Sequence, residues 1–314
     1  MTARAVWGAA WPVAFAALGM IAAALARAGL ADAAGSARVL AASAIGVLAV
    51  IAALAGFARR DGPVMRLATP ALFGALILWL WEMVVVGLQV PRVLLPAPSA
   101  IAAAFSTHLP TLGADFRQTF VRAVIPGYLL GCGAGFAVAL AIDRSPFLRR
   151  GLLPLGNLVS VMPIVGIAPI MVMWFGFDWQ SKAAVVVVMT FFPMLVNAVA
   201  GLAEAGVMER DLMRSYAAGY WQTLMKLRLP VALPFVFNAL KLNSTLALIG
   251  AVVAEFFGTP ILGMGFRIST EAARMDLDLV WATITVAALA GSLSFGAIAL
   301  IERTVTFWHP SFRR

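Results

Sequence analysis

The amino-acid sequence predicts an all-α fold, a polytopic membrane helical bundle of about eight transmembrane helices. Three observations lead to this fold class. Of the 314 residues, 62% are hydrophobic and only 12% are charged, and the mean hydropathy is +0.96; soluble domains carry about twice that share of charges. The apolar residues fall into charge-poor runs long enough to cross a bilayer as helices. The alternating pattern of a membrane β-barrel is absent, so the backbone must satisfy its hydrogen bonds within helices.

The expected spans follow one another along the whole chain: 7–26, 39–58, 67–88, 120–142, 152–175, 183–203, 233–257 and 279–301. The first run follows Arg4, but no clear cleavage site leads into polar sequence, so we expect a retained helix rather than a signal peptide. The fifth run contains Pro154, Pro163 and Pro169, and proline removes a backbone donor and bends a helix. This run is either a bent packing helix or a broken helix that lines a pore.

Two connections are too rich in proline or glycine to be spans. Residues 91–111 should contain a short surface helix around "PAPSAIAAAF", with Ser99 near its start as a candidate cap. Residues 258–278 predict a loop with a short helix. Within the fourth span, the small residues of "GCGAG", 131–135, lie four apart and predict close helix packing.

The distribution of basic residues sets the expected orientation. With the N-terminus inside the cell, fourteen Lys and Arg fall in inside connections and eight in outside segments or helix ends. This bias favours cytoplasmic termini and a cytoplasmic segment at 203–232. The net charge of +9 is therefore a sign of topology rather than of nucleic-acid binding.

One charged segment, "RDLMRSYAAGYWQTLMKLRLPVALP" at 210–234, interrupts the apolar chain. Glu209 and Asp211 are acids suited to the start of a helix. Residues four apart then predict one apolar and aromatic face on a single short helix: Leu212, Tyr216, Tyr220 and Leu224. Leu229-Pro230 should end it, because the residue before proline leaves helical geometry. Such a helix either lies on the membrane or docks into a groove on a soluble partner.

This segment resembles the conserved cytoplasmic loop of permease subunits of binding-protein-dependent ABC importers. That loop reads Glu-Ala-Ala, three residues, Gly, and a Leu-Pro thirteen residues after the Gly. Asp211 stands where the family has Glu, and Ala217, where the family has Gly, precedes Pro230 by thirteen residues. The resemblance implies a helix that couples to an ATPase and a small side chain at its closest approach. The implied coupling residues are Asp211, Leu212, Met213, Ser215, Tyr216, Ala217, Leu229 and Pro230.

Further stretches resemble the sulfonate, taurine, nitrate and pyrimidine-precursor branch of these permeases. They are "LLPAPSAI" (94–101), "FFPMLVNAVAGL" (191–202), "LRLPVALPFVFNALKLN" (227–243) and "GAVVAEFFG" (250–258). The resemblance covers about residues 67–314. It implies a six-helix type I permease domain at 61–314, preceded by an N-terminal two-helix membrane extension at 1–60.

The resemblance also implies the partners and the location. These are a cytoplasmic ABC ATPase dimer, a periplasmic solute-binding protein, a second permease (a copy or a similar chain) and lipid, in the bacterial inner membrane. No nucleic acid is expected. A phosphate-binding loop needs Gly-Lys-Ser/Thr, and none of the three lysines follows a glycine. The chain is therefore expected to bind no cofactor and to be no enzyme, with ATP bound by the partner subunit.

Polar groups inside spans are the candidates for a translocation path. They are Asn197, Asn238, Lys241, Asn243 and Thr245. Lys241 could instead reach the cytoplasmic interface, and Glu255 is expected at the outer end of its helix, in contact with solvent or a docked receptor. No residues suggest a catalytic or metal site. The alternative function is a self-contained secondary transporter, which would favour an inverted repeat and acids at mid-membrane. For an importer, the expected solute is a small, flat or anionic organic molecule.

Overall fold

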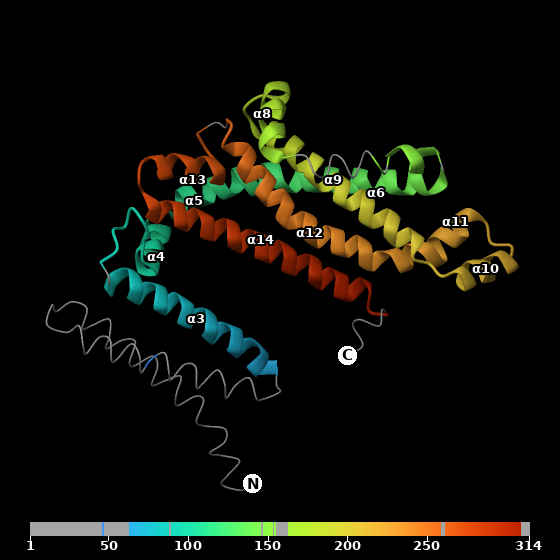
Figure 1. The fold of residues 1–314 in the computed structure, drawn as a ribbon, viewed down its shortest axis with the longest axis horizontal. Coiled ribbons are helices and arrows are strands. Elements are labelled where there is room, and N and C mark those ends of the chain that lie inside the picture. The colour runs from blue at the N-terminus through green and yellow to red at the C-terminus, as the bar shows by residue number, and fades with distance from the viewer. Residues whose placement is uncertain are drawn as a thin grey trace, which may run out of the picture. The chain divides into compact units, whose positions relative to one another are not determined.

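A computed structural model describes residues 46, 63–87, 89–145, 147–152, 154, 163–258 and 261–308. These residues form helices and connections without a strand, which confirms the all-α prediction (Figure 1). Five helices among them are long and apolar enough to cross a membrane: Ala68–Gly87, Leu109–Arg144, Trp179–Ala203, Tyr220–Glu255 and Leu277–Val305. The first two predicted spans lie outside the described residues apart from residue 46, so the total of eight stays a prediction, as does the domain boundary at residue 60.

The chain divides into two compact units, residues 1–104 and 105–314. The first unit contains helix α3 (Pro63–Gly87) and the beginning of α4 (Pro98–Thr107). Because α4 begins at Pro98, Ser99 lies inside the helix, and the expectation that it caps the helix was wrong. Its backbone N–H and its hydroxyl both donate to the Glu82 carboxylate, at 2.9 and 2.7 Å.

Two unbroken helices of 36 residues each organise the second unit. The first joins α5 (Leu109–Phe116), the π-helix η1 (Arg117–Val124) and α6 (Ile125–Arg144). The second joins α11 (Tyr220–Thr223), the π-helix η2 (Leu224–Arg228) and α12 (Leu229–Glu255). At 1.5 Å per residue, each is about 54 Å long, longer than the predicted spans 120–142 and 233–257.

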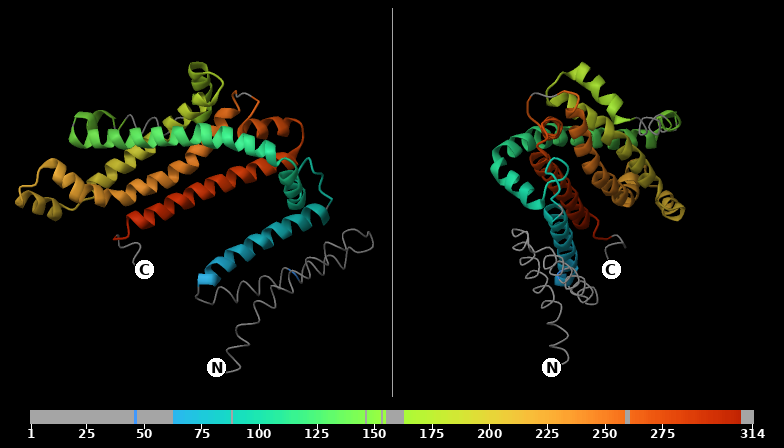
Figure 2. Two further views of the ribbon diagram at one scale, coloured as in Figure 1. Left: turned by 180° about the vertical axis from the view of Figure 1, so that it is seen from behind. Right: turned by 60° about the vertical axis from the view of Figure 1, so that its left-hand side comes forward.

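The second unit contains further described helices. They are α8 (Ile164–Phe175), α9 (Trp179–Ala203), α10 (Val207–Ser215), α13 (Met264–Ala273) and α14 (Leu277–Val305). Helix α9 packs along both α6 and α12, and α14 runs along α12 (Figures 1 and 2). The short helix predicted between residues 258 and 278 is α13. Residues 155–162 of the predicted fifth span lie outside the described residues, so its course stays a prediction.

Each π-helix ends two residues before a proline, Pro126 or Pro230. The backbone N–H of Ile125 donates to Phe120, and that of Leu229 to Leu224, five residues back. Proline lacks an N–H, and its ring meets the carbonyl four residues back in a regular α-helix; the widened turn accommodates it. The sequence-based prediction that Leu229-Pro230 ends the charged helix was therefore wrong, because Leu229 keeps helical dihedrals (φ −65°, ψ −47°).

Three of the four glycines of α6 face α9, and Gly131 and Gly135 do so as the small-residue spacing predicts; a Cβ on the fourth, Gly133, would meet open space. A Cβ on Gly131 would collide with Thr190, and one on Gly135 with the Phe191 carbonyl. Gly127, one turn earlier, belongs to the same face, since its Cβ would lie 2.7 Å from the Ala183 oxygen. Only glycine at these positions permits the observed approach of the two backbones.

Candidate functional site

The charged segment between α9 and α12 contains two short helices instead of one. Helix α10 ends at Ser215, and α11 begins at Tyr220. Between them Ala217 adopts the left-handed conformation, with φ +51°. Its N–H donates to the Arg214 oxygen at 2.9 Å, and the Ala218 N–H donates to the Met213 oxygen at 3.0 Å. This hydrogen-bond pair is a Schellman motif, which ends a helix, so the prediction of one continuous helix was wrong.

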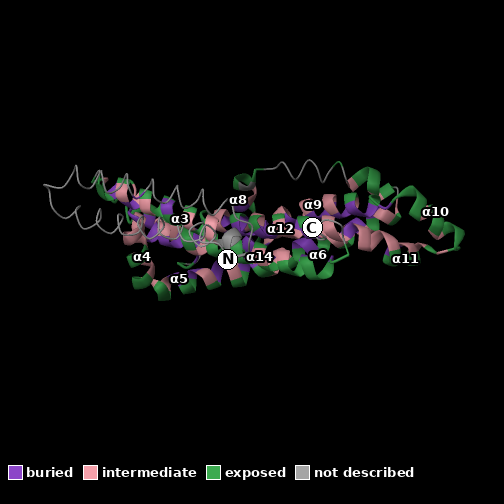
Figure 3. Ribbon diagram, turned by 90° about the horizontal axis from the view of Figure 1, so that it is seen from below, coloured by how far each residue is buried: buried purple, intermediate pink, exposed green. Residues whose placement is uncertain are grey.

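The break divides the predicted apolar face. Leu212 and Tyr216 are 55% and 78% exposed, whereas Leu224 is 2% exposed and packs against Leu202 and Ala232. We define the docking surface as the exposed large apolar residues of this segment: Val207, Met208, Leu212, Tyr216, Trp221 and Met225. Exposed residues predominate along α10 (Figure 3).

Most polar residues of α10 are also exposed, whereas Arg210 is half-buried. Asp211 accepts a hydrogen bond from the Arg214 guanidinium at 3.1 Å, and its backbone oxygen accepts one from the Ser215 hydroxyl at 3.0 Å. The acid in the first turn of α10 is Glu209. Asp211 therefore lies past the helix start, where the expected interaction with the helix dipole is weak. Met213 is half-buried.

A largely buried ion pair attaches this segment to the bundle. Arg228, in η2, donates to both oxygens of Asp143 at the end of α6, at 2.7 and 2.5 Å, and to the Leu202 carbonyl of α9 at 2.9 Å. The Tyr220 hydroxyl donates to the same carboxylate at 2.9 Å, and the Arg144 guanidinium lies over the Tyr220 ring at 5.3 Å. Bidentate Arg–carboxylate pairs fix orientation, so the base of the segment is held rigidly. Sequence reasoning missed this pair because its partners lie far apart in the chain.

The structure does not gather the five path candidates into one site. Asn197 donates to the Pro193 oxygen of its own helix at 2.8 Å. Asn243 is buried and donates to the Thr190 oxygen at 2.8 Å, across the contact between α12 and α9. Asn238 and Thr245 are exposed on α12, in line with the exposed apolar residues Leu242 and Ile249.

Lys241 has a partner that the sequence analysis did not identify. Its ammonium lies 2.7 Å from the Glu302 carboxylate of α14, and both side chains are largely buried. Lys241 stands midway between Arg228 and Glu255 along α12, so this ion pair joins two spans well inside one of them. Charged residues inside membrane helices are functional candidates.

At the opposite end of α12, Glu255 is only 3% exposed. Both of its carboxylate oxygens accept from the Thr119 hydroxyl, at 2.8 and 3.0 Å, and Oε2 accepts from the Gly265 N–H at 2.7 Å. The expectation that Glu255 contacts solvent or a docked receptor was therefore wrong. Asp115, which is fully buried, accepts from the Gly263 N–H at 2.8 Å.

Arg267 of α13 completes this cluster. Its guanidinium lies 2.8 Å from the Asp115 carboxylate and 3.3 Å from that of Glu271. The hydrogen bond to Asp115 raises the pKa of Arg267 above its ordinary value. Among the described residues, no group of three or more His, Cys, Asp or Glu is arranged to hold a metal ion.

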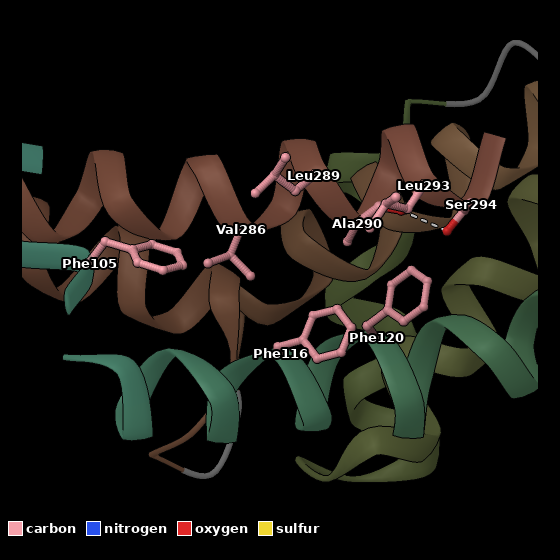
Figure 4. A pocket seen from close by; sticks show the side chains of 8 residues that line it. All are labelled: Phe105, Phe116, Phe120, Val286, Leu289, Ala290, Leu293 and Ser294. Carbon is pink, nitrogen blue, oxygen red and sulfur yellow. Dashed lines mark hydrogen bonds between the residues drawn. The ribbon is translucent and has the colours of Figure 1, made fainter. Parts of the chain in front are cut away.

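An apolar pocket of about 270 Å³ lies between α14 and the helix that begins with α5. Figure 4 shows Phe116 and Phe120 facing Val286 and Leu293 across it. The lining hydroxyl of Ser294 donates to the backbone of its own helix at 2.7 Å. Ligand sites orient a solute with convergent polar groups, which this pocket lacks, so it is a weak candidate for solute recognition.

These features define a polytopic membrane protein that carries a rigidly attached, exposed apolar surface between two of its spans. Residues 127–307, more than half of the chain, match the family described as "Binding-protein-dependent transport system inner membrane component". The chain belongs to this family.

Its relatives are transport permeases. A "Probable ABC transporter permease protein" of Haemophilus influenzae is 31% identical over 71% of this chain and 90% of its own length. The formylaminopyrimidine transport permease protein ThiX of Halalkalibacterium halodurans is 30% identical over 76% of this chain and 95% of its own. The taurine transport system permease protein TauC of Escherichia coli is 29% identical over 56% and 63%.

The family and these relatives confirm the principal prediction from the sequence. The chain is a multi-pass membrane permease subunit of a binding-protein-dependent transporter, in the branch that includes sulfonate, taurine and pyrimidine-precursor permeases. It is a transport component rather than an enzyme. A self-contained secondary transporter does not fit this family.

Proposed function

We propose that the chain couples solute import to ATP hydrolysis by seating its docking surface in a cleft of a cytoplasmic ATPase dimer. The observation that carries this proposal is the combination of an exposed apolar surface on α10 with the largely buried Arg228–Asp143 pair at its base. A helix that only lies on the membrane needs apolar contact with lipid. A helix that transmits force also needs a rigid attachment to the spans, which this pair supplies.

The coupling residues then divide into two groups. Asp211, Leu212, Ser215 and Tyr216 are exposed and would meet the ATPase, with Met213 and Ala217 shaping the helix and its end. Leu229 and Pro230 lie at the half-buried start of α12. Their role would be to continue the helix from the segment into the span.

The positive-inside bias supports an orientation with α10, α11 and both termini in the cytoplasm of a bacterium, and with α13 on the outer side of the inner membrane. A periplasmic binding protein would deliver the solute there. The chain would bind no cofactor, and ATP would bind to the partner subunit.

A second permease, either a copy of this chain or a similar one, would complete the path. Exposed Asn238 and Thr245 support this pairing, because a polar side chain in the middle of a span is costly to expose to lipid. Together with Lys241, they would line the path between the two permeases. Asn197 and Asn243 would serve helix packing, since both donate within the bundle.

The solute would be a small, flat or anionic organic molecule. The names of two relatives, a formylaminopyrimidine permease and a taurine permease, support this class. Calorimetry with the binding protein would test the solute, and tight binding of a sugar or a peptide would contradict the proposed class.

Co-purification tests the docking surface. In the co-expressed transporter, Leu212→Asp should abolish retention of the ATPase, because a charge would replace an apolar contact at the centre of the surface. Ile261→Asp is the matched control, since Ile261 is 79% exposed near α13, and it should retain the ATPase. Equal retention by both variants, with normal membrane insertion, would show that α10 is not the docking site.

A further inference from the structure

A cluster of buried polar side chains lies at the end of the second unit opposite α10, and the proposed function does not use it. Three successive backbone N–H groups at the start of α13 each donate to a side chain from another helix. Gly263 donates to Asp115 at 2.8 Å, Met264 to the Thr119 hydroxyl at 2.8 Å, and Gly265 to Glu255 at 2.7 Å. We call Asp115, Thr119 and Glu255 the α13 anchor.

The chemistry of a helix start explains why these side chains suit the position. The first N–H groups of a helix have no partner within it, and the positive end of the helix dipole favours carboxylates. A local capping residue ordinarily serves this role. Here the acceptors come from α5, η1 and α12 and are 0%, 0% and 3% exposed, respectively, so α13 is attached to two other helices.

Two glycines allow this close approach. Gly263 has φ +137°, a conformation that favours glycine. A Cβ there would lie 2.6 Å from the Glu255 carboxylate, and a Cβ on Gly265 would collide with the Val252 carbonyl. The start of α13 is therefore shaped to sit directly on the end of α12.

The two long helices that bear the anchor are also joined at their other ends. Asp143 and Arg228 pair where α10 and α11 are attached. Between the two ends, the Tyr128 hydroxyl donates to the Leu240 oxygen at 3.0 Å. Cross-links at both ends and near the middle make the two helices one stiff frame, with the docking surface at one end and α13 at the other.

We propose that Asp115, Thr119 and Glu255 are positioning residues that make α13 move with this frame, so that displacement of the docking surface reaches α13 on the opposite side of the membrane. The inference rests on the proposed coupling function. It assigns a transmitting role to buried residues that touch neither the ATPase nor the path. Loss of one of these three hydrogen bonds is expected to weaken the other two, because the three acceptors bind adjacent N–H groups of one helix.

Thr119 offers the sharpest test, because its hydroxyl both donates to Glu255 and accepts from Met264. Thr119→Val keeps the shape of the side chain and removes both hydrogen bonds. Thr119→Ser keeps the hydroxyl and is the matched control. Neither substitution touches the docking surface or the Arg228–Asp143 pair.

The experiment uses the full transporter with its co-purified ATPase, reconstituted in lipid. Hydrogen exchange of the backbone amides of residues 261–275 is measured without nucleotide and with ATP plus orthovanadate, which traps the ATPase. Wild type and Thr119→Ser should show at least a several-fold difference in exchange rate between the two states. In Thr119→Val, exchange should be fast in both states, and the difference should fall below twofold while ATPase retention stays normal.

Three results would overturn the proposal. One is a full nucleotide-dependent difference in Thr119→Val, which would reduce the anchor to a structural contact. Another is unchanged exchange without nucleotide in Thr119→Val, which would mean that these bonds do not hold α13. The third is a wild-type permease that retains no ATPase, which would remove the coupling function itself and is distinguishable because it does not depend on residue 119.

Discussion

Substitutions of Ala217 can test whether the size of the side chain or the conformation of the backbone decides which residues this position accepts. The resemblance to permease loops suggested that a small side chain is needed for close approach to the ATPase. The structure supplies a different reason, since Ala217 is exposed and has φ +51°. The left-handed conformation costs an L-residue roughly 1–2 kcal/mol. Glycine avoids this cost but gains freedom in the unfolded chain, which offsets about 0.4–1 kcal/mol.

Ala217→Gly should therefore stabilise the end of α10 by about 0.5–1 kcal/mol. Asn and Val have similar volumes and separate the two explanations. Asn tolerates the left-handed region, so Ala217→Asn should stay close to wild type. A β-branched residue is strained there, and Ala217→Val should cost roughly 1–3 kcal/mol. If size alone mattered, both variants would fail alike.

Hydrogen exchange of the α10 amides, with ATPase retention and uptake in vesicles, measures these effects. A change of about 1 kcal/mol alters the exchange of locally opening amides roughly fivefold. Ala272→Gly, in the last turn of α13, is the control of opposite sign: it should speed exchange of the α13 amides, because glycine in a helix costs up to about 1 kcal/mol. Equal exchange and equal uptake in Ala217→Asn and Ala217→Val would refute the backbone explanation.

Three further predictions concern charges and topology. Arg228→Met should lower the stability of the permease by about 3 kcal/mol, because it leaves a largely buried carboxylate with only the Tyr220 hydrogen bond; a melting temperature within about 2 °C of wild type would contradict this. Lys241→Met should destabilise the permease for the same reason, and adding Glu302→Gln should recover most of the lost melting temperature. If this double variant regains its stability but takes up no solute, Lys241 also serves the translocation path. Full uptake by the double variant would mean that the Lys241–Glu302 pair has only a structural role. Met208→Cys in a Cys132→Ala background should react with an impermeant thiol reagent only from the cytoplasmic side, and labelling of intact cells would reverse the orientation.

The fold class follows from the sequence because apolar runs of span length permit few solutions in lipid. The ends of the helices could not be predicted from the sequence in the same way. Leu229-Pro230 has the sequence of a helix stop, but the π-helical turn before it absorbs the proline, and only packing of the neighbouring helices decides between these outcomes. The same holds for Ala217, where a single left-handed residue divided a periodic apolar face in two.

The site residues show a similar limit. Exposed Leu212 and Tyr216 could be identified from local periodicity, since Leu212 lies in α10 and Tyr216 is the C-cap residue of the same helix. The partners of Glu255 could not, because Thr119 is far away in the chain and acids near span ends ordinarily meet water. The available signal was the presence of Asp115 and Glu255 beside apolar runs, next to a glycine-rich loop whose N–H groups needed acceptors.

The π-helix Leu224–Arg228 lets the chain hold one extra residue without turning the docking surface away from its direction. A π-helical turn holds about one residue more than an α-helical turn. Because both turns complete one rotation, removing one residue there would restore regular helix and leave the α10 side in nearly the same direction relative to α12. The same deletion within a regular α-helix would rotate the α10 side by about 100°. Relatives that gain or lose a single residue at this place would thus present the same surface to the same cleft.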